Sequence, residues 1–176
     1  MHMPKINHLV VLCVTGMLIS ILVGCASQLK HSKPGTETTI ILTRHAEKTV
    51  FTHDLTEKGR ARAQSLARLL ADKKITAIFC PDIARNLDTA EPLAKMMNIK
   101  ITVVSSTPYP EKVVNAMLTQ HSGGVVLWVG NTSNLSEIYS QLGGKGEAPD
   151  NYGDLFIMKI KDQGAPEVAK IRYEAH

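Results

Sequence analysis

The chain has 176 residues, which is enough for one globular domain and too few for two of ordinary size. Hydrophobic residues make up 44% of it and charged residues 20%, so the composition is that of a folded protein and not of a disordered one. The formal net charge of +4 comes from scattered cations, and aromatic residues are only 5% of the chain, which argues against a nucleic-acid partner.

The first segment is an uncharged apolar run, residues 9–24, that is short for a membrane span and suits the core of a signal peptide. It ends in "LVGC", which resembles the lipobox of bacterial lipoproteins, where a peptidase cuts before the cysteine and lipid is attached to its sulfur. The resemblance implies a signal peptide over residues 1–24, lipid on Cys25 and a place in the bacterial cell envelope. The alternative is an uncleaved N-terminal anchor helix.

The residues after Cys25 bear on where the protein resides. Ala26 and Ser27 follow it without an aspartate, a pattern that favours the outer membrane in proteobacterial lipoproteins, so we expect its periplasmic face. The remainder of 25–37 is polar and is predicted to be a flexible tether. The folded domain is then expected over residues 38–176.

Apolar runs that read as strands recur through this domain. Four are continuous, as expected for strands buried on both faces of a sheet, at 38–43, 75–80, 99–104 and 124–130. Two more, at 154–161 and 167–174, are predicted to form a hairpin or edge strands.

Helical patterns lie between the runs, at 56–73, 83–97, 110–120 and 132–144. Thr56 is the predicted N-cap of the first helix, and Pro92 is expected to bend or interrupt the second. The arginines Arg60, Arg62 and Arg68 of the first helix are expected to face solvent. Because strands and helices alternate, we predict a three-layer α/β/α sandwich with a mainly parallel central sheet.

Charged and polar residues stand where several of these strands end. Arg44 and His45 follow the first run, Asn131 follows the fourth, and Arg85 comes a few residues after the second. In open α/β sheets, ligands bind at the carboxyl ends of the strands. We therefore expect these four residues to share one site.

The segments around them resemble, in order, those of the histidine phosphatase superfamily, which has the phosphoglycerate mutase-like fold. They are "TRHAEK", "DLTEKGRARAQSLARLL", "IFCPDIARNLDTAEPLA", "VVLWVGNTSNLSEI" and "YGDLFIMKI". The resemblance covers nearly all of the chain after Thr38. It implies hydrolysis of a phosphomonoester through a phosphohistidine, with no cofactor and no metal.

Carried over residue by residue, the resemblance makes His45 the nucleophile and makes Arg44 and Arg85 the clamps for the phosphate. The chemistry agrees, because a neutral imidazole attacks phosphorus and guanidinium groups bind phosphate oxygens in pairs. The expected partners are a phosphorylated small molecule or a phosphate group of the envelope, and the membrane through Cys25. The sequence leaves the substrate and the oligomeric state open.

The chain departs from the family at the second histidine, whose place Asn131 takes. An amide donates a hydrogen bond to phosphate but carries no positive charge. Loss of one such stabilising group lowers the rate by roughly a hundred-fold or more. Two readings stay open: a slow envelope phosphatase, and a catalytically degenerate, lipid-anchored module that binds a phosphoryl ligand without turnover.

The general acid is open as well. Glu47, Asp82 and Asp88 are the candidates for protonating the leaving oxygen. Glu47 is counted among the catalytic residues, although a structural role is expected for it ahead of a catalytic one.

Overall fold

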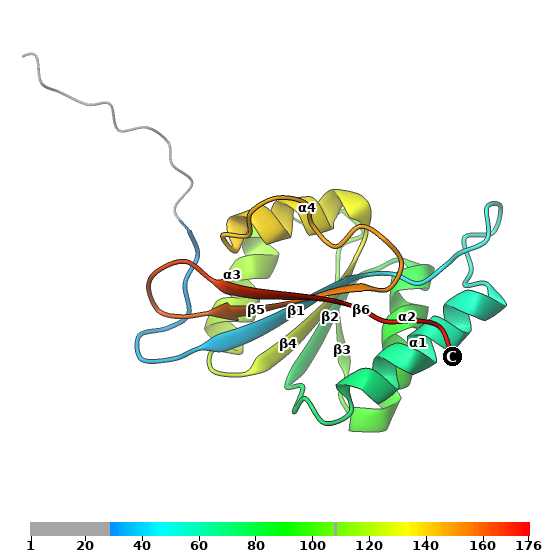
Figure 1. The fold of residues 1–176 in the computed structure, drawn as a ribbon, viewed down its shortest axis with the longest axis horizontal. Coiled ribbons are helices and arrows are strands. Elements are labelled where there is room, and N and C mark those ends of the chain that lie inside the picture. The colour runs from blue at the N-terminus through cyan, green and yellow to red at the C-terminus, as the bar shows by residue number, and fades with distance from the viewer. Residues whose placement is uncertain (1–28, 108) are drawn as a thin grey trace, which may run out of the picture.

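The computed structural model describes residues 29–107 and 109–176 (Figure 1). The predicted signal peptide, 1–24, and the predicted lipid attachment at Cys25 lie outside the described residues and stay predictions. Within the described part of the chain, no helix is both long and apolar enough to span a bilayer.

Six strands form one sheet in the order β3-β2-β4-β1-β5-β6. The strands are β1 (Thr38–Arg44), β2 (Ala77–Pro81), β3 (Ile101–Val104), β4 (Val125–Gly130), β5 (Asp154–Ile160) and β6 (Glu167–Arg172). The first four are parallel, while β5 pairs antiparallel with β1 and β6 pairs antiparallel with β5. The predicted mainly parallel sheet is confirmed, and the tail forms a hairpin at its edge.

Within residues 29–107 and 109–176, four helices cover the sheet, two on each face (Figure 1). They are α1 (Glu57–Leu70), α2 (Ala84–Met97), α3 (Pro110–Gln120) and α4 (Thr132–Gln141). Residues of α3 and α4 share one core cluster with the sheet, and residues of α1 and α2 share the other. The three-layer sandwich is therefore confirmed.

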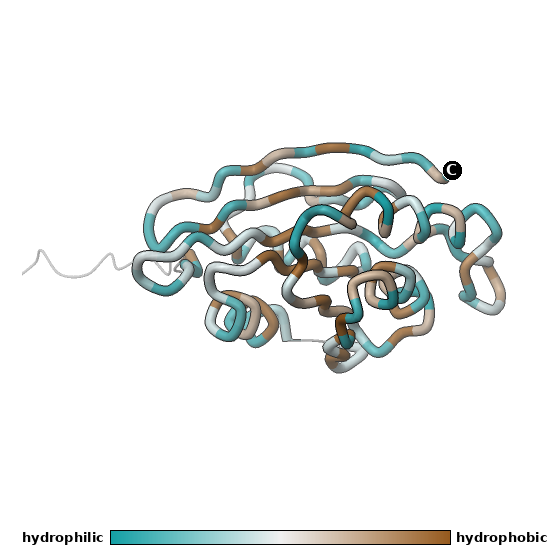
Figure 2. The backbone as a smooth tube through the Cα atoms, turned by 90° about the horizontal axis from the view of Figure 1, so that it is seen from below, coloured by the Kyte–Doolittle hydropathy of each residue, from teal (hydrophilic) through white to brown (hydrophobic). Residues whose placement is uncertain are grey.

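Neighbouring residues of a strand point into different cores. Ile40 and Trp128 belong to the cluster under α3 and α4, whereas Ile41 and Leu127 belong to the cluster under α1 and α2. Since both faces are covered, the central positions of β1 and β4 are apolar one after another. Figure 2 shows the resulting hydrophobic stretches along the strands, with hydrophilic positions frequent in the connecting loops.

Two local signals at the helices have different outcomes. Thr56 caps α1, and its hydroxyl accepts from the Gly59 N–H at 3.0 Å, as predicted. The predicted interruption at Pro92 is wrong, because α2 continues through it. The proline deprives only the Asp88 carbonyl of a helical partner, and Asp88 is at an exposed position of the helix.

The described part of the predicted tether, 29–37, is fastened to the domain. Ser32 is 5% exposed, and its hydroxyl donates to the Ile160 carbonyl at 2.8 Å. The Gly35 N–H donates to Asp162 Oδ2 at 2.8 Å. The polar composition predicted a free linker, but these short side chains satisfy backbone groups at the amino edge of the sheet. The segment that is free to act as a tether is therefore shorter than 25–37.

Candidate active site

The ends of two neighbouring parallel strands bring the candidate residues together. Arg44 ends β1 and stands in register with Gly130, which ends β4. The His45 N–H extends this ladder by donating to the Gly130 carbonyl at 3.0 Å. His45 and Asn131 thus leave the sheet side by side at its carboxyl edge.

His45 is buried, with 3% of its surface exposed. Its Nδ1 lies 2.7 Å from the Ala46 carbonyl oxygen, so Nδ1 carries the hydrogen and Nε2 keeps the lone pair. Burial lowers the pKa of His45 to about 4, and the charges of Arg85 and Arg44 act in the same direction, against the hydrogen bond to Ala46. The imidazole is therefore neutral at physiological pH and has a free nitrogen for attack.

Arg85 and Asn131 are joined by a hydrogen bond, in which Arg85 Nη2 donates to Asn131 Oδ1 at 3.2 Å. Asn131 is also the N-cap of α4: its side chain accepts from the Asn134 N–H, and Asn134 Oδ1 accepts from the Asn131 N–H at 2.9 Å. The amide oxygen is thus occupied, which leaves the NH₂ group as the part of Asn131 suited to an anion.

Arg44 is held by a segment that sequence reasoning missed. Its Nη1 donates to the Asp150 carbonyl at 2.7 Å, and its guanidinium carbon lies 4.6 Å from the centre of the Tyr152 ring. The Tyr152 and His45 rings are 5.9 Å apart between centroids. Tyr152 stands just before β5, so the antiparallel pairing of β5 with β1 was the information needed to place it here.

Both candidate clamps keep an unused donor. Among the described residues, the buried Nε atoms of Arg44 and Arg85 have no hydrogen-bond partner. A buried donor without a partner is costly, and both of these belong to cationic groups of the kind that suit an anion.

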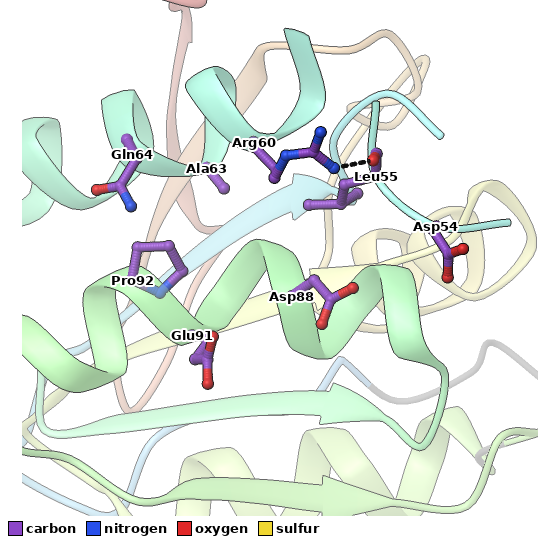
Figure 3. A pocket seen from close by; sticks show the side chains of 8 residues that line it. All are labelled: Asp54, Leu55, Arg60, Ala63, Gln64, Asp88, Glu91 and Pro92. Carbon is purple, nitrogen blue, oxygen red and sulfur yellow. Dashed lines mark hydrogen bonds between the residues drawn. The ribbon is translucent and has the colours of Figure 1, made fainter. Parts of the chain in front are cut away.

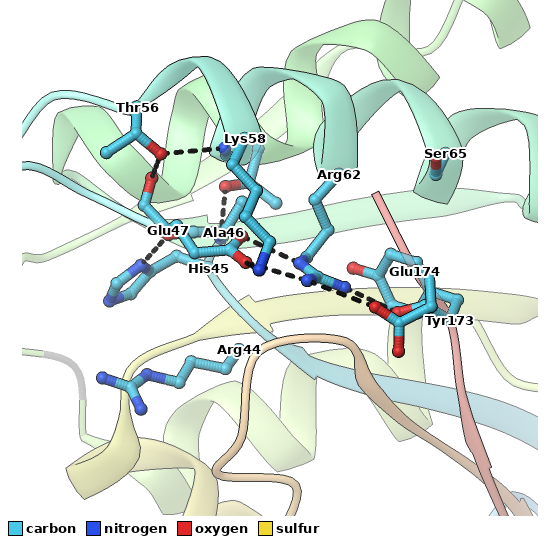
Figure 4. Close-up of polar contacts among 12 residues, drawn as sticks. Arg44, His45, Ala46, Glu47, Thr56, Lys58, Arg62, Ser65, Tyr173 and Glu174 are labelled. Atoms are coloured by element: carbon cyan, nitrogen blue, oxygen red, sulfur yellow. Dashed lines mark hydrogen bonds and ion pairs between the residues drawn. The ribbon is translucent and has the colours of Figure 1, made fainter. Parts of the chain in front are cut away.

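Glu47 is placed in an ion pair behind the nucleophile (Figure 4). Arg62 Nε and Nη2 donate to its two oxygens, each at 2.8 Å, and Arg62 Nη1 donates to the Tyr173 carbonyl at 2.6 Å. Burial raises the pKa of Glu47, but the hydrogen bonds and charge of Arg62 outweigh it and hold that pKa below its usual value. Glu47 thus stays ionised, which favours the structural role. The expectation that Arg62 faces solvent is wrong, because it is 3% exposed and neutralises this buried carboxylate.

Of the two other candidate carboxylates, Asp88 has a raised pKa. It lies one turn along α2 from Arg85, on the same side of the helix. Burial raises the pKa of Asp88, and the negative charges of Glu91 and Asp54 raise it further. Asp82 is exposed, between β2 and α2.

Asp88 borders a surface groove between α1 and α2 (Figure 3). The groove has a volume of about 360 Å³, and Asp54, Arg60 and Glu91 also line it. Arg60 is fixed there by donating to the Leu55 carbonyl at 2.6 Å. The groove thus has polar walls of both signs.

Over residues 29–107 and 109–176, no three His, Cys, Asp or Glu side chains gather in a way that could hold a metal ion. Cys80 is fully buried, and burial raises the pKa of its thiol to about 12, so it is not a second nucleophile.

Comparison with known proteins agrees with this geometry. Residues 40–106 match the model of the histidine phosphatase superfamily (branch 1), a span that holds Arg44, His45 and Arg85 and ends before Asn131. A search of curated proteins found no sequence match.

Several solved structures share the fold. The protein histidine phosphatase SixA complexed with tungstate is 14% identical with a TM-score of 0.63, over 76% of this chain and 96% of that one. YhfR of Bacillus stearothermophilus is 22% identical with a TM-score of 0.61, over 75% and 95%. A mycobacterial glucosyl-3-phosphoglycerate phosphatase with inorganic phosphate is 11% identical with a TM-score of 0.52, over 78% and 98%. The described chain thus has the fold of the histidine phosphatases, and its residues 40–106 match that superfamily in sequence.

Proposed function

We propose that the protein is a histidine phosphatase, which hydrolyses phosphomonoesters through a phosphohistidine on His45. One observation carries the proposal: a buried, neutral imidazole whose Nδ1 is fixed on the Ala46 carbonyl stands among the guanidinium groups of Arg44 and Arg85. This arrangement supplies a nucleophile and positive charge for the phosphate oxygens at one place.

In the first step, His45 Nε2 attacks phosphorus while the ester P–O bond breaks. Arg44, Arg85 and the Asn131 NH₂ hold the phosphoryl oxygens. Asp88 gives its proton to the leaving oxygen, for which its raised pKa suits it. The ring becomes positive, and the Ala46 carbonyl that accepts from Nδ1–H stabilises it.

In the second step, water attacks the phosphohistidine and the N–P bond breaks. The Asp88 carboxylate takes a proton from the attacking water, inorganic phosphate leaves, and His45 returns to its neutral state. The same carboxyl group thus serves as acid and then as base.

A second candidate function is binding without turnover, and Asn131 favours it. The residue is neutral and its oxygen is bound to Arg85 and α4, so the transferring phosphoryl group lacks one cation. The nucleophile is kept, with a pKa low enough to leave the imidazole neutral, and we therefore give precedence to a slow enzyme.

Hydrolysis of p-nitrophenyl phosphate by the mature chain decides between the two. For the enzyme, we expect turnover that disappears in His45→Ala and rises in Asn131→His. Turnover that appears only in Asn131→His would identify a binding module. Turnover that survives His45→Ala would overturn the proposed nucleophile.

The proposed location is the periplasmic face of the bacterial outer membrane, with lipid on Cys25. It is supported by the apolar run 9–24 and the "LVGC" segment that ends it. The proposed substrate is a phosphorylated small molecule or a phosphate group of the envelope.

A further inference from the structure

We propose that the amino edge of the sheet is a docking face for an anionic membrane surface, so that the active site opens away from the membrane that anchors the protein. The inference rests on the lipid at Cys25 that is part of the proposed function. It does not rest on catalysis by His45.

The first described residues fix where the chain approaches the domain. Lys30 N–H donates to the Gln141 carbonyl at the end of α4, at 3.4 Å, and its Nζ pairs with Glu111 at 3.1 Å. Ser32 then binds at Ile160, the end of β5. Because β5 is antiparallel to β1, the contacts at the end of α4 and at the end of β5 lie at the amino edge of the parallel strands, whereas Glu111 stands in the first turn of α3.

The length of chain between lipid and domain limits how far the amino edge can move from the bilayer. Lys30 is the fifth residue after Cys25, which allows at most about 17 Å between them when the chain is fully extended. The seven residues of β1 (Thr38–Arg44) place the site about 20 Å farther on, at the opposite edge. Figure 1 shows the first described residues and the 48–55 loop at opposite ends of the molecule. A tether of this length cannot turn the carboxyl edge toward the anchoring membrane.

Charge at the amino edge fits that orientation. Four exposed lysines stand where strands begin: Lys33 before β1, Lys73 and Lys74 before β2, and Lys100 directly before β3. Following the sheet order, they are spread from its β3 edge to β1.

Of the acidic residues at this edge, two are already paired with other lysines. Glu37 lies 3.9 Å from Lys159, and Glu167 pairs with Lys161. Asp162 accepts from the Gly35 N–H, and Asp72 is exposed. The four lysines therefore leave an excess of positive charge next to the anchor, and anionic headgroups attract such clusters.

The orientation can be measured without catalysis. The lipidated full-length product is reconstituted in phosphatidylcholine–phosphatidylglycerol vesicles with a single dye, on Lys74→Cys or on Val50→Cys, and energy transfer to a labelled lipid is recorded. Cys80 is fully buried and Cys25 carries the lipid, so the introduced thiol takes the dye.

We expect strong energy transfer from position 74 and weak transfer from position 50, which is 76% exposed on the 48–55 loop. Equal transfer, or stronger transfer from position 50, would overturn the proposal. Absence of lipid on Cys25 by mass spectrometry would overturn it as well. Both the energy-transfer measurement and the mass measurement can be made on a protein without phosphatase activity, so they test the orientation separately from catalysis.

The role of the lysines is tested on the mature chain with Cys25→Ala, which has no lipid. Lys74→Gln with Lys100→Gln should weaken binding to the phosphatidylglycerol vesicles about tenfold. The matched pair Lys48→Gln with Lys58→Gln, in the segment and the helix that follow the carboxyl end of β1, should leave it within about twofold. Equal losses of vesicle binding in the two pairs would show that lysines attract the vesicle wherever they lie on the domain, and would overturn the docking face.

Discussion

At the scale of residues, the protonation of one imidazole decides whether the site can react. Burial and two nearby guanidinium groups keep His45 neutral, and the Ala46 carbonyl selects the tautomer that exposes Nε2. The same cations bind the anionic substrate. The environment therefore serves attack and binding together.

The pH dependence of the rate follows from two groups. With phenyl phosphate, kcat/KM should rise as pH increases through about 4, where His45 loses its proton, and fall as pH passes the raised pKa of Asp88. Asp88→Asn should remove the fall and lower the rate about a hundred-fold, with a smaller loss for p-nitrophenyl phosphate, whose leaving group needs no proton. A rising limb near the ordinary histidine value of about 6.5 would contradict the account.

Asn131→His should have opposite effects on rate and on stability. The cation should raise kcat for p-nitrophenyl phosphate, by up to about a hundred-fold. Loss of the asparagine cap of α4 should lower the free energy of unfolding by about 1 kcal/mol, as measured by urea denaturation. Asn131→Ala is the matched control, with the same loss of stability and no gain in rate. A gain in rate in both variants would show that charge is not the missing contribution.

The sequence could predict that Arg44, His45, Arg85 and Asn131 lie together, because each follows a strand of a parallel sheet. It could not predict the contacts of Arg44 with Asp150 and Tyr152. Those residues lie in an irregular segment before β5, whose path depends on tertiary pairing and not on local pattern.

At the scale of elements, the segment after His45 is clamped to α1. Glu47 pairs with Arg62, and the Glu47 carbonyl accepts from the Thr56 N–H at 2.9 Å. The nucleophile's backbone is thus tied to the helix that packs below it. The sequence pattern predicted that Arg62 is one of several exposed arginines, since periodicity alone does not show that it pairs with Glu47.

Arg62→Met should lower the free energy of unfolding by about 3 kcal/mol, because it leaves the partly buried Glu47 carboxylate with only the exposed Lys58, 3.6 Å away. Arg68→Met, at an exposed position of the same helix, should cost less than about 1 kcal/mol. Urea denaturation measures both.

The loss should also change with pH. Glu47 has a lowered pKa in the folded state, so its stabilisation is present above its unfolded pKa and disappears as pH falls through the folded pKa. The difference between parent and Arg62→Met should shrink in acid. A difference that is constant with pH would contradict a role for the ion pair.

Gly59→Ala tests how closely α1 approaches the nucleophile segment. Alanine normally stabilises a helix by about 1 kcal/mol over glycine. Here a Cβ would lie 2.1 Å from the Glu47 carbonyl oxygen, so the segment must shift. We expect lower stability by urea denaturation and a lower kcat, with Gln64→Ala as the control at an exposed position of the same helix. Gain of stability in Gly59→Ala would rule out the close approach.

At the scale of the whole molecule, the polarity of the sheet separates attachment from chemistry. Residues 29–37 bind at the amino edge, and the site lies at the carboxyl edge. Alternation of strands and helices was enough to predict the layers and the parallel sheet. It was not enough to predict that 29–37 would be fastened, because isolated serine and threonine hydrogen bonds leave no periodic pattern.

This separation predicts a limit on substrates. Lipidated protein in vesicles should hydrolyse p-nitrophenyl phosphate in solution. It should hydrolyse phosphatidate in its own vesicle at least tenfold more slowly than a variant with a long Gly-Ser linker inserted after Ser27. The reason is that the short tether of about 17 Å keeps the site away from the bilayer. The linker variant should be unchanged toward p-nitrophenyl phosphate. Equal rates on phosphatidate with and without the linker would contradict the orientation.

The central claim is that His45 carries the phosphoryl group, and the most direct measurement is to trap it there. The mature protein is mixed with p-nitrophenyl phosphate, quenched in alkali, which preserves phosphohistidine, and digested for mass spectrometry. The account predicts phosphate on His45 in the parent and none in His45→Ala. Turnover without phosphorylated His45, or with phosphate on another residue, would contradict it.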